Sequence, residues 1–458
     1  MYIRNDYVYD DENLAFIPQR ISTPEARVII QKYSTNKGEY KKIEKLMNKK
    51  KKQKYTMIDK FPIFGGIAVT YDCQLRCSYC ANSSEENSRY KTDINDVIIF
   101  VKYLIRNFKI RKLIDSDIEI ITVYLTGAGE PTYDWPLFCE VVETVRKLCK
   151  KEGIRCKINL TTNGILTNSQ IEYVCKNIDT FMVSFDGLPE IQNKSRRFND
   201  NSHSSNMVLN TLKRLDEFGA TYTIRSTLWH SDLKYIKDMF HFIYEELKNF
   251  GEWSINIITS TGRASNYSIE GKEYDVTDFF NDYIDITNEA NIKYHGSKTS
   301  LFFVTNSLCG IACGLSDANT PFLYPDKSLH ICIDASDISP NVGYISEGKV
   351  ILYDSYPKDF FDVYYDKYFK CKNCIAFRFC AGGCPIHSMR ENNLASVEFE
   401  CAFIKKYYEY VFEKILDGKE SFGWYGQKIY VKELDDYFIQ ITNHDLEADR
   451  LAKVKSKL

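Results

Sequence analysis

The chain has 458 residues, more than a single hydrophobic core usually serves, so we expect two or three domains. Hydrophobic residues make up 44% and charged residues 27%, as in ordinary soluble proteins, and the net charge of -2 gives no global reason to expect nucleic acid as a partner. The N-terminus lacks a signal peptide's basic and apolar parts, and no apolar run could cross a bilayer. We therefore expect a cytoplasmic protein with no membrane partner.

Residues 1–58 are predicted to form a small hairpin–helix module. The segment "YIRNDYVYDDENLAFIP" predicts two short strands joined by an Asp/Asn turn. A helix is expected to follow, because Ser22 or Thr23 suits its N-cap, Pro24 its first position and Glu25 its first turn. A second helix, over "EYKKIEKLMNKKKKQK", ends in a lysine run that we interpret as a solvated linker face.

Residues 59–300 alternate between strand and helix patterns. Amphipathic helical stretches separate short β-branched runs, which predict six strands at residues 66–70, 121–126, 156–161, 181–185, 222–227 and 253–258. Six strand–helix units imply an α/β fold, in which a parallel sheet covered by helices curves into a partial (β/α)6 TIM-like barrel. Chemistry in such folds gathers at the carboxyl ends of the strands. Residues at or near those ends are Cys73, Gly127, Asn163, Ser184 and Arg225.

The alternation stops near residue 300. Residues 301–402 are rich in Cys, Gly, Pro and aromatic residues, which predicts a loop-rich domain. Its hydrophobic core would be small, so we expect it to need covalent or metal crosslinks. Residues 403–458 are predicted to form a C-terminal extension, with a helix from Ala402 and a hairpin near "KIYVKELDDYFIQI". The pattern suggests no function for that extension.

The fifteen cysteines do not fit a disulfide framework in a cytoplasmic protein. Eleven of them fall in two clusters, for which metal or iron–sulfur ligation is the better explanation. The other four are scattered in amphipathic segments, and we interpret them as small buried hydrophobic residues: Cys139, Cys149, Cys156 and Cys175.

The first cluster is "CQLRCSYC", which spaces Cys73, Cys77 and Cys80 as C-x3-C-x2-C. A closed zinc site needs a fourth ligand, but no His or Cys lies within forty residues after Cys80. A 4Fe–4S cluster tolerates three thiolates and keeps one iron open for a small chelating molecule. The pattern therefore favours the cluster over zinc.

Four motifs in order resemble the radical S-adenosylmethionine (SAM) superfamily, over roughly residues 63–260. The three cysteines match its C-x3-C-x2-C motif, with Tyr79 as the aromatic residue before the last cysteine. "TGAGEP" (126–131) resembles its glycine-rich motif, although Ala128 replaces a glycine often found there. "TTNG" (161–164) and "SFDG" (184–187) stand at the next two strand ends.

The resemblance implies a SAM-binding site. Gly127 and Gly129 would allow close backbone approach, and Glu130 would face the cofactor's ammonium. Ser184 and Arg196 would hold the methionine carboxylate or the ribose.

The resemblance also places Asn163 near the ribose and Arg225 in the pocket lining. It implies that the cluster, reduced by a donor such as flavodoxin or ferredoxin, passes one electron to SAM. A 5'-deoxyadenosyl radical then abstracts a hydrogen from an unactivated carbon.

The second array resembles the SPASM-type auxiliary-cluster domain. By analogy, one 4Fe–4S cluster would be held by Cys309, Cys313, Cys332 and Cys384, and another by Cys371, Cys374, Cys380 and Cys401. Lys327 stands where a glycine is expected, but a turn around Pro325 and Asp326 could still form. One or two four-cysteine zinc sites are the alternative. If Cys309 is not a ligand, the first auxiliary cluster has an open iron.

SPASM-type relatives chiefly modify peptides and proteins, and auxiliary clusters suggest an oxidative outcome. The resemblance implies a maturase that forms a thioether or carbon–carbon crosslink in a ribosomally made precursor, whose leader the N-terminal module would bind as an added strand. The alternative is a formylglycine-forming enzyme of the sulfatase-maturase kind, in which an Asp follows the second SPASM cysteine. Here Ile333 intervenes before Asp334, which stays a candidate base. A non-enzymatic iron–sulfur or zinc-stapled binding protein is a second alternative.

Overall fold

The computed structural model describes residues 2–4, 7–10, 15–18, 61–84, 90–114, 118–259, 261–265, 274–295, 298–301, 321–332, 341–353, 394–416, 423–424 and 427–428. The helices predicted between residues 22 and 55 lie outside this part, as do Asp334 and six of the eight cysteines of the second array. No helix among the described residues is long and apolar enough to span a membrane.

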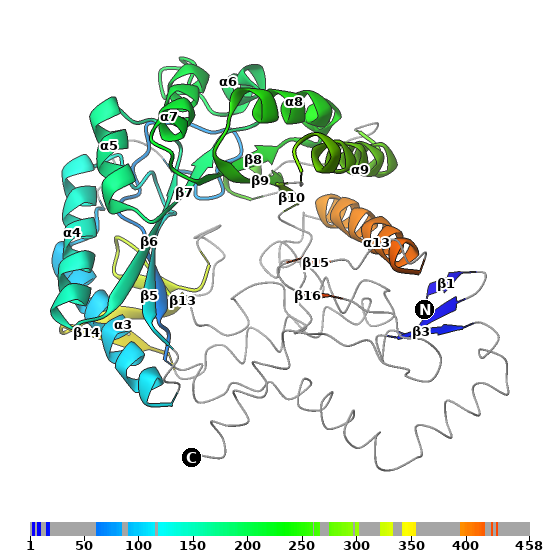
Figure 1. The fold of residues 1–458 in the computed structure, drawn as a ribbon. Coiled ribbons are helices and arrows are strands. Elements are labelled where there is room, and N and C mark those ends of the chain that lie inside the picture. Colours follow the sequence, from blue (N-terminus) through cyan, green and yellow to red (C-terminus); the bar gives the residue numbers. More distant parts are fainter. Residues whose placement is uncertain are drawn as a thin grey trace, which may run out of the picture.

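Six parallel strands form the centre of the sheet, as the periodicity predicts. They pair in sequence order and are β4 (Phe64–Ile67), β5 (Ile120–Leu125), β6 (Arg155–Thr162), β7 (Thr180–Ser184), β8 (Tyr222–Leu228) and β9 (Phe250–Ile257). Figure 1 shows this curved sheet with helices along its outer side, so the expected partial barrel is confirmed. The predicted strand bounds are within three residues of those observed.

The covering helices are amphipathic. They are α3 (Ile94–Ile114), α4 (Trp135–Lys151), α5 (Asn168–Asn177), α6 (Pro189–Ser195), α7 (Ser205–Glu217), α8 (Ile236–Glu246) and α9 (Val276–Lys293). In α4, Phe138, Val141, Val142 and Val145 are buried at helical spacing. The same helix begins where Asp134 accepts a hydrogen bond from the Leu137 amide.

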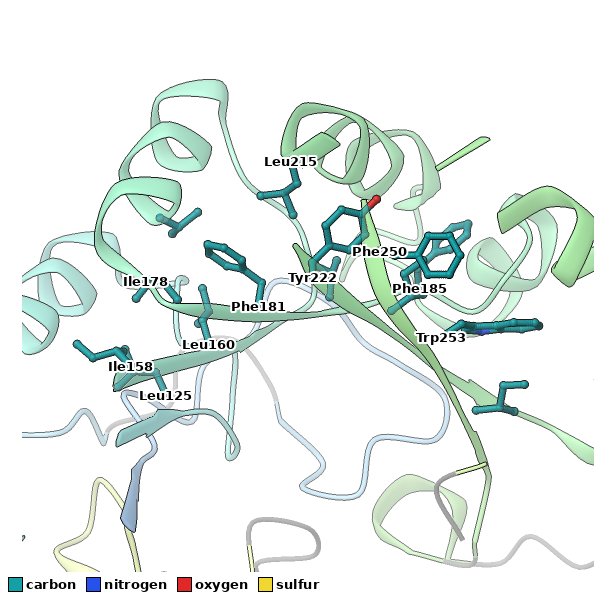
Figure 2. Close-up of a cluster of buried hydrophobic side chains, with 14 of the residues drawn as sticks. Leu125, Ile158, Leu160, Ile178, Phe181, Phe185, Leu215, Tyr222, Phe250 and Trp253 are labelled. Carbon is teal, nitrogen blue, oxygen red and sulfur yellow. The ribbon is translucent and has the colours of Figure 1, made fainter. Parts of the chain in front are cut away.

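The core lies between the sheet and these helices. Figure 2 shows Leu160, Phe181, Tyr222 and Trp253 among its buried side chains. Burial alternates along β7 and β8, because successive residues of a strand point to opposite faces. In β8 the fully covered face carries Tyr222 and Ile224, which leaves Arg225 and Thr227 for the inner face of the barrel.

Strands at both edges extend the barrel sheet to eleven strands within the described residues. One edge gains β10 (Thr299–Leu301), parallel to β9, and the other gains β11 (Phe322–Leu323), parallel to β4. Antiparallel strands β12 (Ser328–His330), β13 (Asn341–Ser346) and β14 (Lys349–Leu352) follow β11. The region that composition describes as loop-rich therefore contributes four strands to the barrel sheet.

The turn between β11 and β12 forms around Pro325 and Asp326, as the sequence allows. The Lys327 amide donates to Tyr324 O at 2.9 Å, and the Ser328 amide donates to Asp326 Oδ1 at 3.0 Å. Lys327 has a φ of +72°, in the left-handed region that favours glycine. This left-handed backbone explains why a glycine is expected at position 327, and Lys327 adopts that left-handed conformation here.

The two chain ends carry short sheets of their own. At the N-terminus, β1 (Tyr2–Arg4), β2 (Tyr7–Asp10) and β3 (Ala15–Pro18) form an antiparallel sheet, so the prediction of two strands was one strand short. Near the C-terminus, α13 (Leu394–Leu416) begins eight residues before the expected start. The hairpin of β15 (Gly423–Trp424) and β16 (Gln427–Lys428) ends where the predicted hairpin begins.

Candidate active site

A pocket opens at the carboxyl ends of the barrel strands, and all the cofactor-binding residues predicted in the barrel line it. They are Cys73, Cys77, Tyr79, Cys80, Gly127, Gly129, Glu130, Asn163, Ser184, Arg196 and Arg225. One placement differs from expectation. Arg225 lies inside β8, three residues before its end, where it is in register with Ser184 of β7.

The loop that carries the three cysteines is held by backbone hydrogen bonds. The Arg76 amide donates to Arg197 O at 2.7 Å, and the Ser78 amide donates to Ser195 O at 2.8 Å. These bonds fix the segment between the first and last cysteines against the end of α6. The Leu75 amide also donates to the Cys73 thiol, with 3.4 Å between N and Sγ.

Arg263 fastens the same loop from the far side of the barrel. Its Nη1 donates to Cys77 O at 3.1 Å, its backbone amide donates to Cys80 O at 3.0 Å, and its Nη2 donates to Ser84 O. Gly262 makes this approach possible, because a Cβ there would lie 2.1 Å from Cys80 O. Sequence reasoning missed Arg263, which follows β9 and stands in none of the quoted motifs.

Burial disfavours thiolates at this site. It raises the pKa of Cys77 to about 11, although the Arg196 guanidinium opposes part of the rise. Burial, together with the neighbouring Cys77 and Glu130, raises the pKa of Cys73 well above its ordinary value. Three thiolates here therefore need cationic partners, and the irons of a cluster would supply that charge. The donor set fits a 4Fe–4S cluster held by three cysteines. Within the described ranges, no three His, Cys, Asp or Glu side chains are placed to hold a single metal ion.

The glycine-rich loop after β5 packs against the segment that leads to the cysteines. The Gly129 amide donates to Thr70 O and the Glu130 amide to Asp72 O, both at 2.8 Å. A Cβ at Gly129 would lie 2.1 Å from Asp72 O, so only glycine fits without a shift. Gly127 and Ala128 both have positive φ, of 82° and 55°, so the position where alanine replaces the frequent glycine is left-handed.

The Glu130 carboxylate is buried and already well coordinated by the protein. It accepts hydrogen bonds from the Thr132 amide and hydroxyl, at 3.1 and 2.7 Å, from the Thr162 hydroxyl at 2.8 Å and from the Asn163 amide at 2.6 Å. Burial raises its pKa, and these bonds oppose the rise. The carboxylate therefore ties the glycine-rich loop to the end of β6.

Asn163 lies closer to the cysteines than expected. Its Nδ2 is 3.7 Å from Cys73 Sγ, and its Oδ1 accepts from the Ile165 amide at 3.0 Å and from Gln74 Nε2 at 3.5 Å. The carboxamide is thus oriented with its donor toward a thiol. Donors of this kind influence the reduction potential of iron–sulfur clusters.

Tyr79, Asp186 and Arg196 form a buried polar network below the cysteine loop. The Tyr79 hydroxyl donates to Asp186 Oδ2 at 2.5 Å and accepts from Arg196 Nη1 at 2.9 Å. Asp186 Oδ1 accepts from the Thr227 amide at 3.1 Å. Burial raises the pKa of Asp186 to about 6, and the Arg196 charge opposes the rise. The "SFDG" motif was recognised in the sequence, but no role was predicted for its Asp186. An acidic residue directly after a predicted strand was a usable signal.

The second array is described at two positions only. Cys332 follows β12 and Cys401 lies in α13, and both are half-buried. The other predicted ligands lie outside the described residues, namely Cys309, Cys313, Cys371, Cys374, Cys380 and Cys384. So does the candidate base Asp334.

The fold and the pocket define a partial-barrel α/β enzyme with a cofactor site at the carboxyl ends of its strands. The radical SAM superfamily profile matches residues 67–243. Residues 67–243 therefore form a radical SAM domain, and enzymes with this domain use SAM and a 4Fe–4S cluster.

Three similar proteins illustrate the likeness. A "Cysteine-type anaerobic sulfatase-maturating enzyme" of Clostridium novyi (strain NT) is 23% identical over 330 residues, or 68% of this chain and 85% of that protein. The structure of "Native anSMEcpe with bound AdoMet and Cp18Cys peptide" covers 77% of this chain and 98% of its own, with 19% identity and a TM-score of 0.55. The Streptococcus suis SuiB structure bound to precursor peptide SuiA has 17% identity and a TM-score of 0.45, covering 73% of this chain and 74% of its own.

Proposed function

We propose that this radical SAM enzyme abstracts a hydrogen atom from a peptide or protein and thereby oxidises that substrate. The observation that carries the proposal is the pocket, which collects the three cysteines and residues of the other three barrel motifs at one end of the sheet. The sulfatase-maturating relative, matched over 85% of its length, supports a polypeptide substrate.

Within the pocket, Cys73, Cys77 and Cys80 are proposed to hold the SAM-binding 4Fe–4S cluster. When bound, cluster and SAM supply the radical that takes the hydrogen. The backbone of Gly127 and Gly129 is proposed to border SAM, and Glu130 to face its ammonium beside the donors that already bind the carboxylate.

The other polar residues are proposed to orient the rest of SAM. Ser184 and Arg196 would hold its carboxylate or ribose, with Asn163 near the ribose and Arg225 in the wall. Tyr79 positions Arg196, since its hydroxyl accepts from that guanidinium.

The SPASM-type domain with two auxiliary clusters is proposed to accept the electron that leaves the oxidised substrate. Cys332 and Cys401 would each contribute to a different cluster. The domain division at residues 58, 300 and 402 belongs to the same proposal.

Crosslink formation in a ribosomally made precursor is our first version of the reaction. The three-stranded N-terminal sheet supports it, because a sheet edge can bind a leader as an added strand. Formylglycine formation is the second version, and the Clostridium novyi relative supports it. In that version Asp334 is the candidate base.

The two versions differ in substrate and in product. The reconstituted enzyme, with SAM and a reductant, is incubated with a cysteine-containing sulfatase-motif peptide. It is also incubated with a candidate ribosomal precursor peptide, with and without the leader. Mass spectrometry would show a pair of hydrogens lost only from the leader-bearing precursor in the first version. In the second, the sulfatase-motif cysteine would become an aldehyde.

A variant with Cys73, Cys77 and Cys80 changed to Ala is the control, and it should modify neither peptide. SAM cleavage without modification of either peptide would contradict both versions of the reaction, and would support only the assignment to radical SAM enzymes. Absence of SAM cleavage by the loaded wild-type enzyme would contradict the proposal itself.

A further inference from the structure

Two cysteines outside both clusters lie together at the end of the barrel opposite to the pocket. Cys149 is fully buried in the last turn of α4, and Cys156 is half-buried as the second residue of β6. The connection between helix and strand is short, and the Ile154 amide donates back to Cys149 O at 3.0 Å. The two thiols are electrostatically coupled, which indicates that they lie next to each other.

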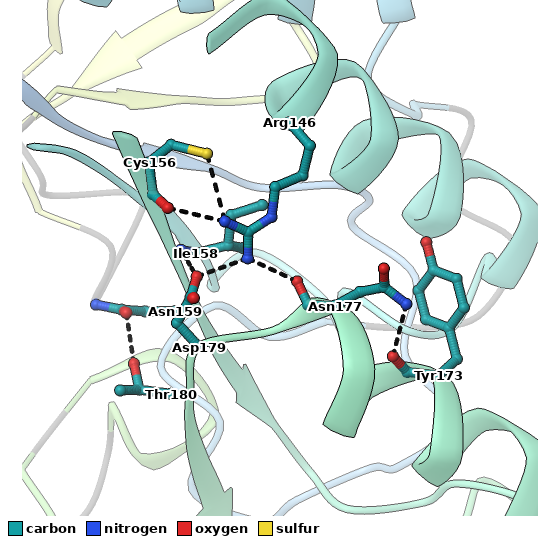
Figure 3. A network of polar contacts seen from close by, with 8 residues as sticks. All are labelled: Arg146, Cys156, Ile158, Asn159, Tyr173, Asn177, Asp179 and Thr180. Atoms are coloured by element: carbon teal, nitrogen blue, oxygen red, sulfur yellow. Dashed lines mark hydrogen bonds and ion pairs between the residues drawn. The ribbon is translucent and has the colours of Figure 1, made fainter. Parts of the chain in front are cut away.

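A guanidinium is fixed beside the Cys156 sulfur. Arg146 Nη1 lies 3.4 Å from Cys156 Sγ and donates to Cys156 O at 2.8 Å. Its Nη2 donates to Asn177 O at 2.8 Å and to Asp179 Oδ2 at 2.6 Å (Figure 3). Because three other contacts hold the guanidinium, its position next to the sulfur is set by the fold.

The sulfur also faces a shallow, basic groove on the protein surface. The residues that line the groove are Arg146, Lys150, Gly153, Ile154, Arg155 and Cys156. Arg155 is paired with Glu119 and Arg146 with Asp179, so of the cationic side chains it is Arg146, beside the sulfur, that can stabilise a thiolate. A small reagent can thus reach Cys156 from solvent, whereas Cys149 is fully buried.

We propose that Cys156 and Cys149 form a hydroperoxide-reactive dithiol, with Cys156 as the attacking thiol and Cys149 as the resolving one. The Cys156 thiolate attacks the peroxide O–O bond, gains one oxygen and releases hydroxide or alkoxide. The Cys149 thiol then attacks the sulfenic sulfur, a disulfide forms, and its proton leaves with the displaced hydroxide as water. The two thiols lose two electrons, which reduce the peroxide.

The electrostatics assign these two roles. The interaction with Cys149 lowers the pKa of Cys156, and the Arg146 guanidinium contributes, while burial and Asp179 oppose the shift. The same interaction raises the pKa of Cys149. Cys156 therefore forms the thiolate, the nucleophilic form, more readily than Cys149 does.

Two other half-buried cysteines provide internal controls. Burial raises the pKa of both Cys139 and Cys175, and Arg146 contacts neither of them. The interpretation of all four scattered cysteines as inert hydrophobic residues is thus retained for these two and revised for Cys149 and Cys156.

Alkylation tests the thiolate. The anaerobic holoenzyme receives a short pulse of iodoacetamide between pH 5 and 9, and each cysteine peptide is quantified by mass spectrometry. We expect half-maximal labelling of Cys156 at a lower pH than that of Cys139 and Cys175, which should be labelled only in alkaline solution. One shared alkaline profile for the three residues would overturn the proposal.

Oxidation tests the disulfide. The holoenzyme is treated briefly with one equivalent of hydrogen peroxide, blocked, and cleaved after glutamate, which separates the two cysteines at Glu152. A linked pair of peptides is expected from the wild type, and a dimedone-trapped sulfenic acid at Cys156 from Cys149→Ser. Neither product at these positions, in a variant that melts like the wild type, would refute the dithiol.

Arg146→Gln tests the guanidinium. We expect Cys156 to react several-fold more slowly with iodoacetamide at pH 6.5 while Cys175 is unchanged. Arg146→Lys should restore part of the rate. Equal rates in all three proteins would show that Arg146 plays no part in the reactivity.

Discussion

At the scale of single residues, the polar groups of the pocket form hydrogen bonds with one another. Asp186 is completely buried, and its two carboxylate oxygens accept hydrogen bonds from the Tyr79 hydroxyl and the Thr227 amide. Arg196 is also buried and donates to Tyr79. Since unpaired buried polar groups are costly, these bonds explain how such residues can line a pocket in a stable fold.

Tyr79→Phe should therefore destabilise the protein. The change removes the hydroxyl that Asp186 and Arg196 share, and it should lower the free energy of unfolding by about 1–3 kcal/mol. Anaerobic urea denaturation measures it. Tyr344→Phe is the control, because this tyrosine is 39% exposed, and it should stay within about 0.5 kcal/mol of the wild type. Equal effects of the two changes would show that the network contributes no stability.

At the scale of elements, close backbone packing between two loops shapes the site. The glycine-rich loop after β5 reaches the segment after β4 because Gly129 has no side chain. A larger residue would push apart the two loops that present Cys73 and Glu130.

Gly129→Ala should weaken SAM binding by about tenfold or more, because a shift of either loop misplaces the cofactor contacts. Isothermal titration of SAM into the reconstituted enzyme measures this. Gly219→Ala is the matched control, since nothing lies within 4 Å of a Cβ there, although its φ of +67° adds some strain. SAM affinity unchanged by Gly129→Ala would show that the loops can separate without consequence.

A second contact between elements involves a buried histidine. The buried His230 ring lies in the 3-10 helix His230–Tyr235 after β8 and meets Phe399 of α13, with 5.0 Å between ring centroids. Burial lowers the pKa of His230 to about 4. Below about pH 6.5 the unfolded chain binds a proton that the native state excludes, so stability falls as the pH decreases.

From this residue we expect the free energy of unfolding to drop by about 1 kcal/mol between pH 7.5 and 5.5. His230→Gln should flatten that slope, and His203→Gln, at an exposed position, should leave it unchanged. Urea denaturation at both pH values gives the slopes. An unaltered slope in His230→Gln would refute the assignment.

At the scale of the whole molecule, the barrel and the region after it share one sheet. β11 pairs with β4, the strand that precedes the cysteine loop, and Phe322 covers Gly66 so closely that a Cβ there would lie 1.9 Å from the Phe322 ring. The region proposed to carry auxiliary clusters is thus joined directly to the strand that precedes the SAM-cluster cysteines.

The cluster scheme predicts the iron content of the intact protein. After anaerobic reconstitution we expect about twelve irons per chain, which fall to about eight when Cys73, Cys77 and Cys80 are changed to Ala. Cys139→Ala and Cys175→Ala should retain about twelve. About four irons in the wild type, with none in the triple variant, would contradict the auxiliary clusters while leaving the radical SAM site intact.

The barrel strands and the residues around the pocket followed from the sequence, because strand periodicity and motif spacing are local properties of the chain. The pairing order then brings strand ends together, so Cys73, Gly127 and Asn163 could be expected to meet. Contacts between distant segments could not be predicted in this way. Arg263 reaches Cys77 across 186 residues, and Tyr79 reaches Asp186 across 107.

Only the tertiary structure decided these contacts, since they depend on how the sheet curves and on which loops then face each other. The same holds for Cys156, whose neighbours in sequence do not reveal the guanidinium of Arg146 or the thiol of Cys149 beside it. Local patterns determine which elements form, and the packing of those elements determines which side chains can react.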